Sequence, residues 1–152
     1  MKLQFRHQQF QADAANAVCD VFAGQPFHAP TYMIDSGFEQ NTRDAEQMLQ
    51  FEQEFTGFNN APVMIADDKI LEHIKAIQRR GQIHQSNELC GRFNFTIEME
   101  TGVGKTYTYI KTMHELNKRY GWSKFIIVVP SVAIREGVYK SFQITEEHFA
   151  ED

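Results

Sequence analysis

A short glycine-rich run near the middle of the sequence has the residue types that bind phosphate. Residues 101–106 read TGVGKT. Gly102 and Gly104 allow the backbone to curl so that successive N–H groups converge on one anion. Lys105 places a flexible cation near the β and γ oxygens of a nucleoside triphosphate, and the Thr106 hydroxyl is a ligand for magnesium. The spacing therefore predicts a nucleotide site.

The full phosphate-loop pattern has a glycine five residues before Gly104, and this sequence has Met99 there. The second half of the pattern is intact. A simpler interpretation is a glycine-rich turn between a strand and a helix in which Lys105 is incidental. The flanking segments bear on this choice, because a functional loop needs a strand before it and a helix after it.

The segments on either side have the expected character. Residues 93–99 alternate apolar and polar side chains as a strand does, and residues 107–120 have helical spacing with Gly121 at the end. Residues 124–129 form a continuous apolar run, typical of a strand buried on both faces of a parallel sheet. Ser131 is placed to cap a further helix through about residue 142. The pattern predicts an α/β fold with a parallel sheet and flanking helices.

The first part of the chain is less regular. Residues 8–22 have apolar side chains at helical spacing, and Asp67 and Asp68 are placed to cap a helix that ends at residues 79–81. Between them, residues 25–62 show weak periodicity, although residues 43–55 could form a helix. We interpret this stretch as an irregular insertion.

Composition narrows the function classes. The 152 residues are 42% apolar, without a run long enough to span a bilayer or a secretory signal, so a cytoplasmic protein is expected. The net charge of -5 argues against coating of nucleic acid through bulk positive potential, so any DNA contact must be local. Cys19 and Cys90 form no CxxC pair and are expected to be free, buried thiols.

Two stretches resemble one protein family. Residues 95–106 and 125–138 are closely similar to the start of the restriction (Res) subunit of type III restriction enzymes, within helicase superfamily two. The METGVGKT form of residues 99–106 looks like that family's own variant, so Met99 supports the resemblance. The similarity extends to the opening helix at residues 8–22 and is low between residues 25 and 90.

The resemblance implies a fold and a domain plan. Residues 1–152 would be the N-terminal portion of a helicase/ATPase RecA-like P-loop domain, apparently truncated, with residues 25–90 as an irregular or helical insertion. ATP and Mg²⁺ would be the cofactors. Residues Thr101 to Gly104, including Gly102 and Val103, would form the backbone cradle, with Lys105 on the phosphates as the catalytic residue and Thr106 on the metal ion.

The resemblance also implies contacts outside the loop. Gln11 is similar to a glutamine that contacts adenine, although Gln8 or Gln9 could take that position, and a solvated helix side chain is the simpler interpretation. Ser131 and Arg135 resemble a motif that touches the nucleic-acid backbone, a contact independent of sequence. Alternatively, Ser131 only caps a helix and Arg135 is a surface charge.

The implied function is the ATP-binding segment of a DNA-dependent ATPase and translocase, part of an endonuclease that cleaves double-stranded DNA with a modification (methyltransferase) subunit. Hydrolysis also needs an acidic magnesium ligand, a water-orienting group and usually an arginine. None is recognisable here, so we expect a truncated product with little or no ATP hydrolysis of its own. The alternatives are a non-catalytic remnant that binds nucleotide or a partner, and a fragment of another superfamily-two helicase.

Overall fold

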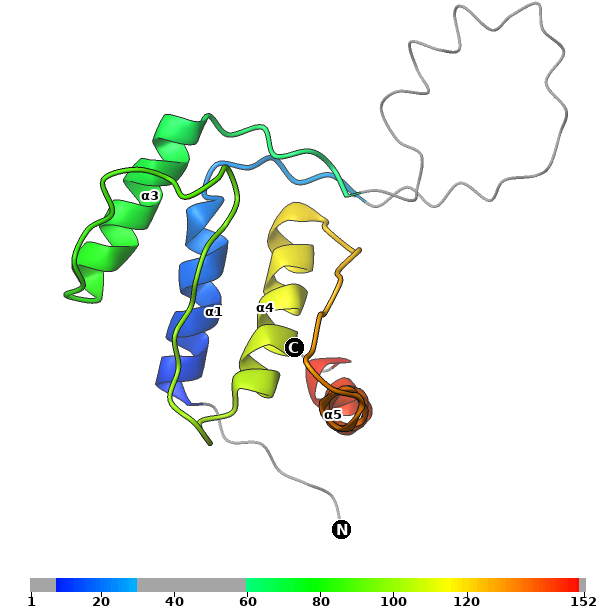
Figure 1. Cartoon of the computed structure of the whole chain (residues 1–152). Coiled ribbons are helices and arrows are strands. Elements are labelled where there is room, and N and C mark those ends of the chain that lie inside the picture. The colour runs from blue at the N-terminus through cyan, green and yellow to red at the C-terminus, as the bar shows by residue number, and fades with distance from the viewer. Residues whose placement is uncertain (1–7, 30–59, 151–152) are drawn as a thin grey trace, which may run out of the picture.

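A computed structural model describes residues 8–29 and 60–150. Within these ranges the chain forms the helices α1 (Gln9–Val21), α3 (Asp67–Arg80), α4 (Lys105–Tyr120) and α5 (Val132–Ala150). Helix α1 lies between α3 and α4, and α5 packs against α4 on the side away from α1 (Figure 1). The possible helix at residues 43–55 lies outside the described residues.

Helices α1 and α4 confirm the predicted helices closely. In α1, Ala15 and Cys19 are one turn apart and both fully buried, which gives the helix a single inward face. Helix α4 ends at Gly121, whose φ of 76° is left-handed and whose N–H donates to the Asn117 carbonyl. This is the αL termination that glycine favours.

The other two helices depart from prediction at their ends. Ala66, not an aspartate, is the N-cap of α3, and Asp67 and Asp68 form its first turn, where negative charge complements the helix dipole. Ser131 precedes α5 as predicted, and its Oγ accepts a hydrogen bond from the Ile134 N–H at 3.3 Å. Helix α5 runs to Ala150, well beyond the predicted end near residue 142.

The core lies where the ends of α1 and α4 meet the segments that follow them. Cys19, Leu116, Tyr120 and Trp122 are buried together. The Tyr120 hydroxyl donates to the Cys19 carbonyl at 2.8 Å, and the Trp122 indole N–H donates to the Ala61 carbonyl at 2.9 Å. Each polar group of these two aromatic side chains is therefore satisfied inside the core.

The cysteines differ from each other. Cys19 is buried, as predicted, whereas Cys90 is exposed, so the prediction of two buried thiols is wrong for Cys90. Burial raises the pKa of the Cys19 thiol to about 11, because the apolar surroundings disfavour the thiolate.

The predicted α/β fold is wrong for the described residues. Residues 93–99 and 124–129 are extended, but neither is a strand, and the described part of the chain contains no sheet. A strand needs a neighbouring backbone for its hydrogen bonds. Here the two segments are separated, one running beside α1 and the other beyond α4 (Figure 1). The parallel sheet of a RecA-like domain is therefore absent from these ranges.

The exposure of the apolar side chains in residues 124–129 also contradicts a buried strand. The run 124–129 was predicted to be buried on both faces, yet Ile126 is 93% and Val128 88% exposed. The Asn60 side chain binds the backbone at the beginning of this run. The Asn60 Oδ1 accepts the N–H groups of Ser123 and Lys124, and its Nδ2 donates to the Lys124 carbonyl. No helix in the described ranges is long and apolar enough to cross a membrane.

Candidate phosphate-binding site

The loop at residues 101–106, called the phosphate loop below, turns directly into α4. Gly102 and Gly104 have φ values of 83° and 87°, in the left-handed region that favours glycine. Gly104 is the N-cap of α4, and no side chain caps this helix. The first amides of any helix lack intrahelical acceptors and carry the positive end of the helix dipole. The sequence correctly predicted a turn with these two glycines at the start of a helix.

The phosphate loop is open on one side, so a ligand could approach its backbone there. A Cβ built on Gly102 would have no heavy atom within 4 Å, so this side of the loop is open. Lys105 is exposed, and its Nζ donates to the Glu100 carbonyl at 2.8 Å. The ammonium group therefore lies back along the loop instead of pointing away from it. A phosphate oxygen could replace the carbonyl as its acceptor, because both are hydrogen-bond acceptors on the protein surface.

Thr106 follows Lys105 in the first turn of α4 and is half-buried. Its assignment as a magnesium ligand stays a prediction, as do the phosphate contacts assigned to Lys105. The donor set fits the group that it was predicted to bind. It combines a mobile cation, a hydroxyl and helix N-terminal amides, which are the usual partners of a triphosphate and its metal ion.

Helix α1 brings Gln11 against this loop. The Gln11 Nε2 donates to the Val103 carbonyl oxygen at 2.8 Å, and the residue is only 9% exposed. Gln9 instead donates to Asp13 within α1, and Gln8 is exposed just before the helix. Of the three glutamines considered from the sequence, Gln11 is thus the one that the fold places at the loop. Contact with adenine stays a prediction.

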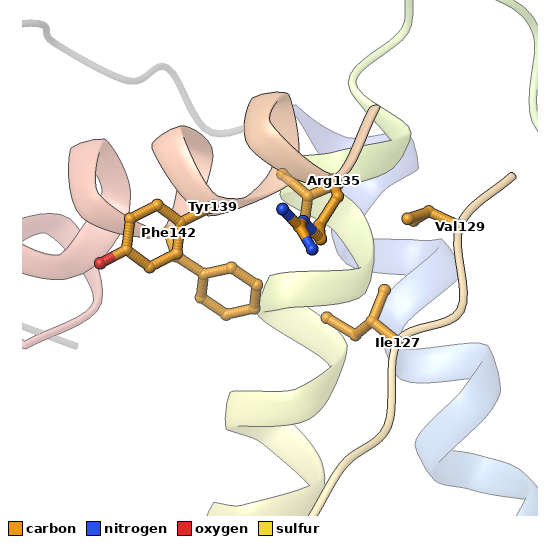
Figure 2. A pocket seen from close by; sticks show the side chains of 6 residues that line it. Ile127, Val129, Arg135, Tyr139 and Phe142 are labelled. Carbon is orange, nitrogen blue, oxygen red and sulfur yellow. The ribbon is translucent and has the colours of Figure 1, made fainter. Parts of the chain in front are cut away.

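Ser131 and Arg135 lie at the start of α5. The Arg135 guanidinium pairs with the Glu136 carboxylate at 2.8 Å, and Ser131 caps the helix. Arg135 also lines a small, largely apolar pocket between residues 127–129 and α5 (Figure 2). The pocket residues are Ile127, Val129, Arg135, Val138, Tyr139 and Phe142. The two simpler interpretations, a cap and a surface charge, describe what the structure shows, and the DNA contact stays a prediction.

An aromatic cluster that the sequence did not reveal joins α5 to the start of α4. The Tyr107 hydroxyl lies 2.9 Å from the His148 Nε2, and the Tyr107 and Phe149 rings are 5.2 Å apart. The His114 ring stacks on Phe149 at 4.7 Å. Burial and the neighbouring Lys111 lower the pKa of His114. The cluster was missed because α5 was expected to end before its last two members.

The known proteins that this chain resembles are all described as Res subunits of type III restriction enzymes. The family described as "Type III restriction enzyme, res subunit" matches residues 64–151. The chain is 38% identical over 97 residues to the type III restriction-modification enzyme EcoPI Res subunit of Escherichia phage P1. It is 37% identical over 97 residues to the EcoP15I Res subunit of Escherichia coli. It is 43% identical over 60 residues to the StyLTI Res subunit of Salmonella typhimurium.

These alignments differ in how much of each protein they cover. The first two include 61% of this chain, and the third includes 38%. The chain spans only 10% of the length of the EcoPI and EcoP15I proteins and 6% of the StyLTI protein. The family match contains α3, the phosphate loop, α4 and the whole of α5.

Proposed function

Because this chain belongs to the res subunit family of type III restriction enzymes, we propose that it is the ATP-binding segment of a DNA-dependent ATPase and translocase. The observation that carries the proposal is the geometry of the phosphate loop. Two left-handed glycines lead into an uncapped helix N-terminus, and Lys105 and Thr106 are the first two helical residues. This arrangement offers backbone donors, a cation and a hydroxyl to one polyphosphate.

Each residue of the loop has a proposed role. The backbone from Thr101 to Gly104 surrounds the phosphates, and the open side at Gly102 admits them. Lys105 exchanges its bond to the Glu100 carbonyl for the β and γ phosphate oxygens. Thr106 binds the Mg²⁺ ion, which neutralises phosphate charge when ATP is bound.

The same proposal includes the domain to which the chain belongs, its DNA contacts and its role in the full-length protein. The chain would be the N-terminal portion of a helicase/ATPase domain, with residues 25–90 as an insertion. Ser131 and Arg135 would contact the DNA backbone, where an arginine pairs with phosphate whatever the base sequence. In the full-length protein, this segment would serve cleavage of double-stranded DNA together with a modification subunit.

A second function is favoured by a different observation. Ile126 and Val128 expose nearly all of their apolar surface, and Val132 nearby is 66% exposed. Contiguous exposed apolar side chains are typical of protein interaction sites. The alternative is therefore a non-catalytic segment that binds nucleotide or a protein partner without turnover.

A binding titration tests the nucleotide site directly. The protein is titrated with a fluorescent ATP analogue and Mg²⁺, beside Lys105→Ala and the matched control Lys111→Ala from the same helix. Loss of a charge-assisted hydrogen bond should weaken binding by about 10- to 100-fold in the first variant only. Equal affinity in all three proteins, or no binding by folded protein, would rule out the site.

Turnover separates the two functions. Phosphate release is measured with and without double-stranded DNA at saturating ATP and Mg²⁺. Because this chain alone is expected to hydrolyse ATP slowly at most, an ATPase segment predicts slow release that DNA stimulates and Lys105→Ala abolishes. Binding without release, in protein that binds the analogue, would favour the non-catalytic alternative.

A further inference from the structure

We propose that Gln11 is a positioning residue that holds the phosphate loop in its binding shape through the Val103 carbonyl. The inference rests on the proposed nucleotide function, which it deepens. It assigns to Gln11 a role that is independent of the nucleotide base. The contact that carries it is the 2.8 Å hydrogen bond from Gln11 Nε2 to Val103 O, which joins residues 92 positions apart in the sequence.

The direction of the Val103 carbonyl controls the amide that follows it. A trans peptide group is planar, so its C=O and the N–H of the next residue point in opposite directions. No cis peptide bond occurs among the described residues. The bond to Gln11 turns the Val103 carbonyl toward α1, and the Gly104 N–H therefore points away from α1. Gln11 thus orients one of the loop amides that would face a phosphate.

The neighbouring glycines make this restraint necessary. Val103 lies between Gly102 and Gly104, both at positive φ, and glycine has more accessible backbone conformations than any other residue. Without an external contact, the Val103–Gly104 peptide group could rotate at low cost. A hydrogen bond from a rigid helix removes that freedom, which lowers the entropy lost when a ligand binds.

The Gln11 side chain is itself well fixed. It is 9% exposed. It lies on the same face of α1 as Ala15 and Cys19, which are fully buried one and two turns farther along the helix. A Cβ added to Gly104 would lie 2.6 Å from the Gln11 Nε2, so the end of the Gln11 side chain would have to move, and the φ of 87° is what favours glycine there. A buried carboxamide without a partner would be unfavourable, and the Val103 carbonyl satisfies it.

A ligand without a base distinguishes loop positioning from base recognition. Affinity is measured for Mg²⁺-tripolyphosphate and for the fluorescent ATP analogue with Mg²⁺. The variant is Gln11→Met, which keeps the length of the side chain and removes the donor. Gln9→Met is the matched control, because Gln9 lies on the same helix and is exposed.

We expect Gln11→Met to weaken both ligands equally, by about 3- to 10-fold, as for loss of one hydrogen bond. Gln9→Met should bind both as the parent protein does. Weaker binding of the ATP analogue alone would overturn the inference and favour base recognition. Unchanged affinity for both ligands would also overturn it.

A measurement without ligand keeps the two proposals separate. Backbone ¹⁵N relaxation reports the order parameters of the Gly102 and Gly104 amides. Both should fall in Gln11→Met, and in Gln11→Ala if the first variant does not fold, while amides in the middle of α1 keep theirs. If the parent protein binds neither ligand, the proposed function fails. The order parameters of the parent and Gln11→Met proteins then test the inference by themselves. Unchanged order parameters would then overturn it.

Discussion

The hydroxyl oxygen of Tyr107 lies 2.9 Å from Nε2 of His148, which connects the first turn of α4 to the last turns of α5. Tyr107 directly follows the phosphate loop, and His148 is 16 residues beyond the start of α5 at Val132. The Phe149 ring packs against Tyr107 and His114 in the same place. The position of α5 therefore depends on a residue adjacent to the loop.

Removal of the Tyr107 hydroxyl should destabilise the protein. Tyr107→Phe keeps the ring contact with Phe149 and deletes the hydrogen bond to His148. The free energy of unfolding should fall by about 1 kcal/mol, measured by urea denaturation. Tyr139→Phe is the control, since Tyr139 is 61% exposed on α5. Equal stability of the two variants would contradict a stabilising contact.

The two cysteines should differ in reactivity. Only the thiolate reacts with iodoacetamide, and burial that raises the pKa of Cys19 to about 11 also blocks access. At pH 8 the folded protein should be alkylated at Cys90 and not at Cys19, as read by mass spectrometry of peptides. Alkylation of both should require denaturant. Equal labelling in the native protein would show that Cys19 is not buried.

The same shift predicts how stability depends on alkaline pH. The pKa of Cys19 is raised from 9.0 to about 11 on folding, so the unfolded state loses its proton first. The stabilisation is complete below pH 9 and is lost as pH rises through the folded pKa, by about 3 kcal/mol in all. Urea denaturation from pH 8 to 11 measures the loss. Cys19→Ala should decline less steeply over this range.

Two glycines should respond in opposite ways to alanine. At Gly121, φ is +76° and a Cβ would clash with the His28 carbonyl oxygen, so Gly121→Ala should cost more than about 2 kcal/mol. At Gly137, inside α5, a Cβ would have nothing within 4 Å. Gly137→Ala should stabilise the protein by about 0.5 to 1 kcal/mol. Thermal unfolding of both variants checks the contrast, and a loss at both positions would contradict it.

Loss of the α5 cap should have a smaller effect. Ser131→Ala removes the acceptor for the Ile134 N–H, which should cost about 0.5 to 1 kcal/mol because the bond is long at 3.3 Å. Ser141→Ala is a matched control, since the Ser141 hydroxyl bonds only to the Gly137 carbonyl of its own helix. Unfolding by urea compares the two. A larger loss for Ser141→Ala would show that Ser131 is not a stabilising cap.

The sequence by itself determined the features that depend on local residue order. The ends of α4 follow from Gly104 and Gly121, because both positions need a left-handed conformation that glycine adopts without strain. The extent of α1 follows from apolar spacing, but its inward face does not, because Phe10 is 46% exposed whereas Gln11 is buried. The family also followed from sequence, since residues 95–106 and 125–138 lie in the matched region 64–151, whereas residues 8–22 lie outside it.

Only the tertiary structure decided which segments meet. Residues 93–99 and 124–129 have the side chains of strands, but a strand also requires a neighbouring backbone, and that condition is not written in either segment. Their extended, unpaired state, with Ile126 almost fully exposed, therefore contradicted the prediction. The contacts from Gln11 to Val103 and from Tyr107 to His148 join distant parts of the chain. Such contacts arise from the packing of whole helices, because local spacing does not specify which faces lie together.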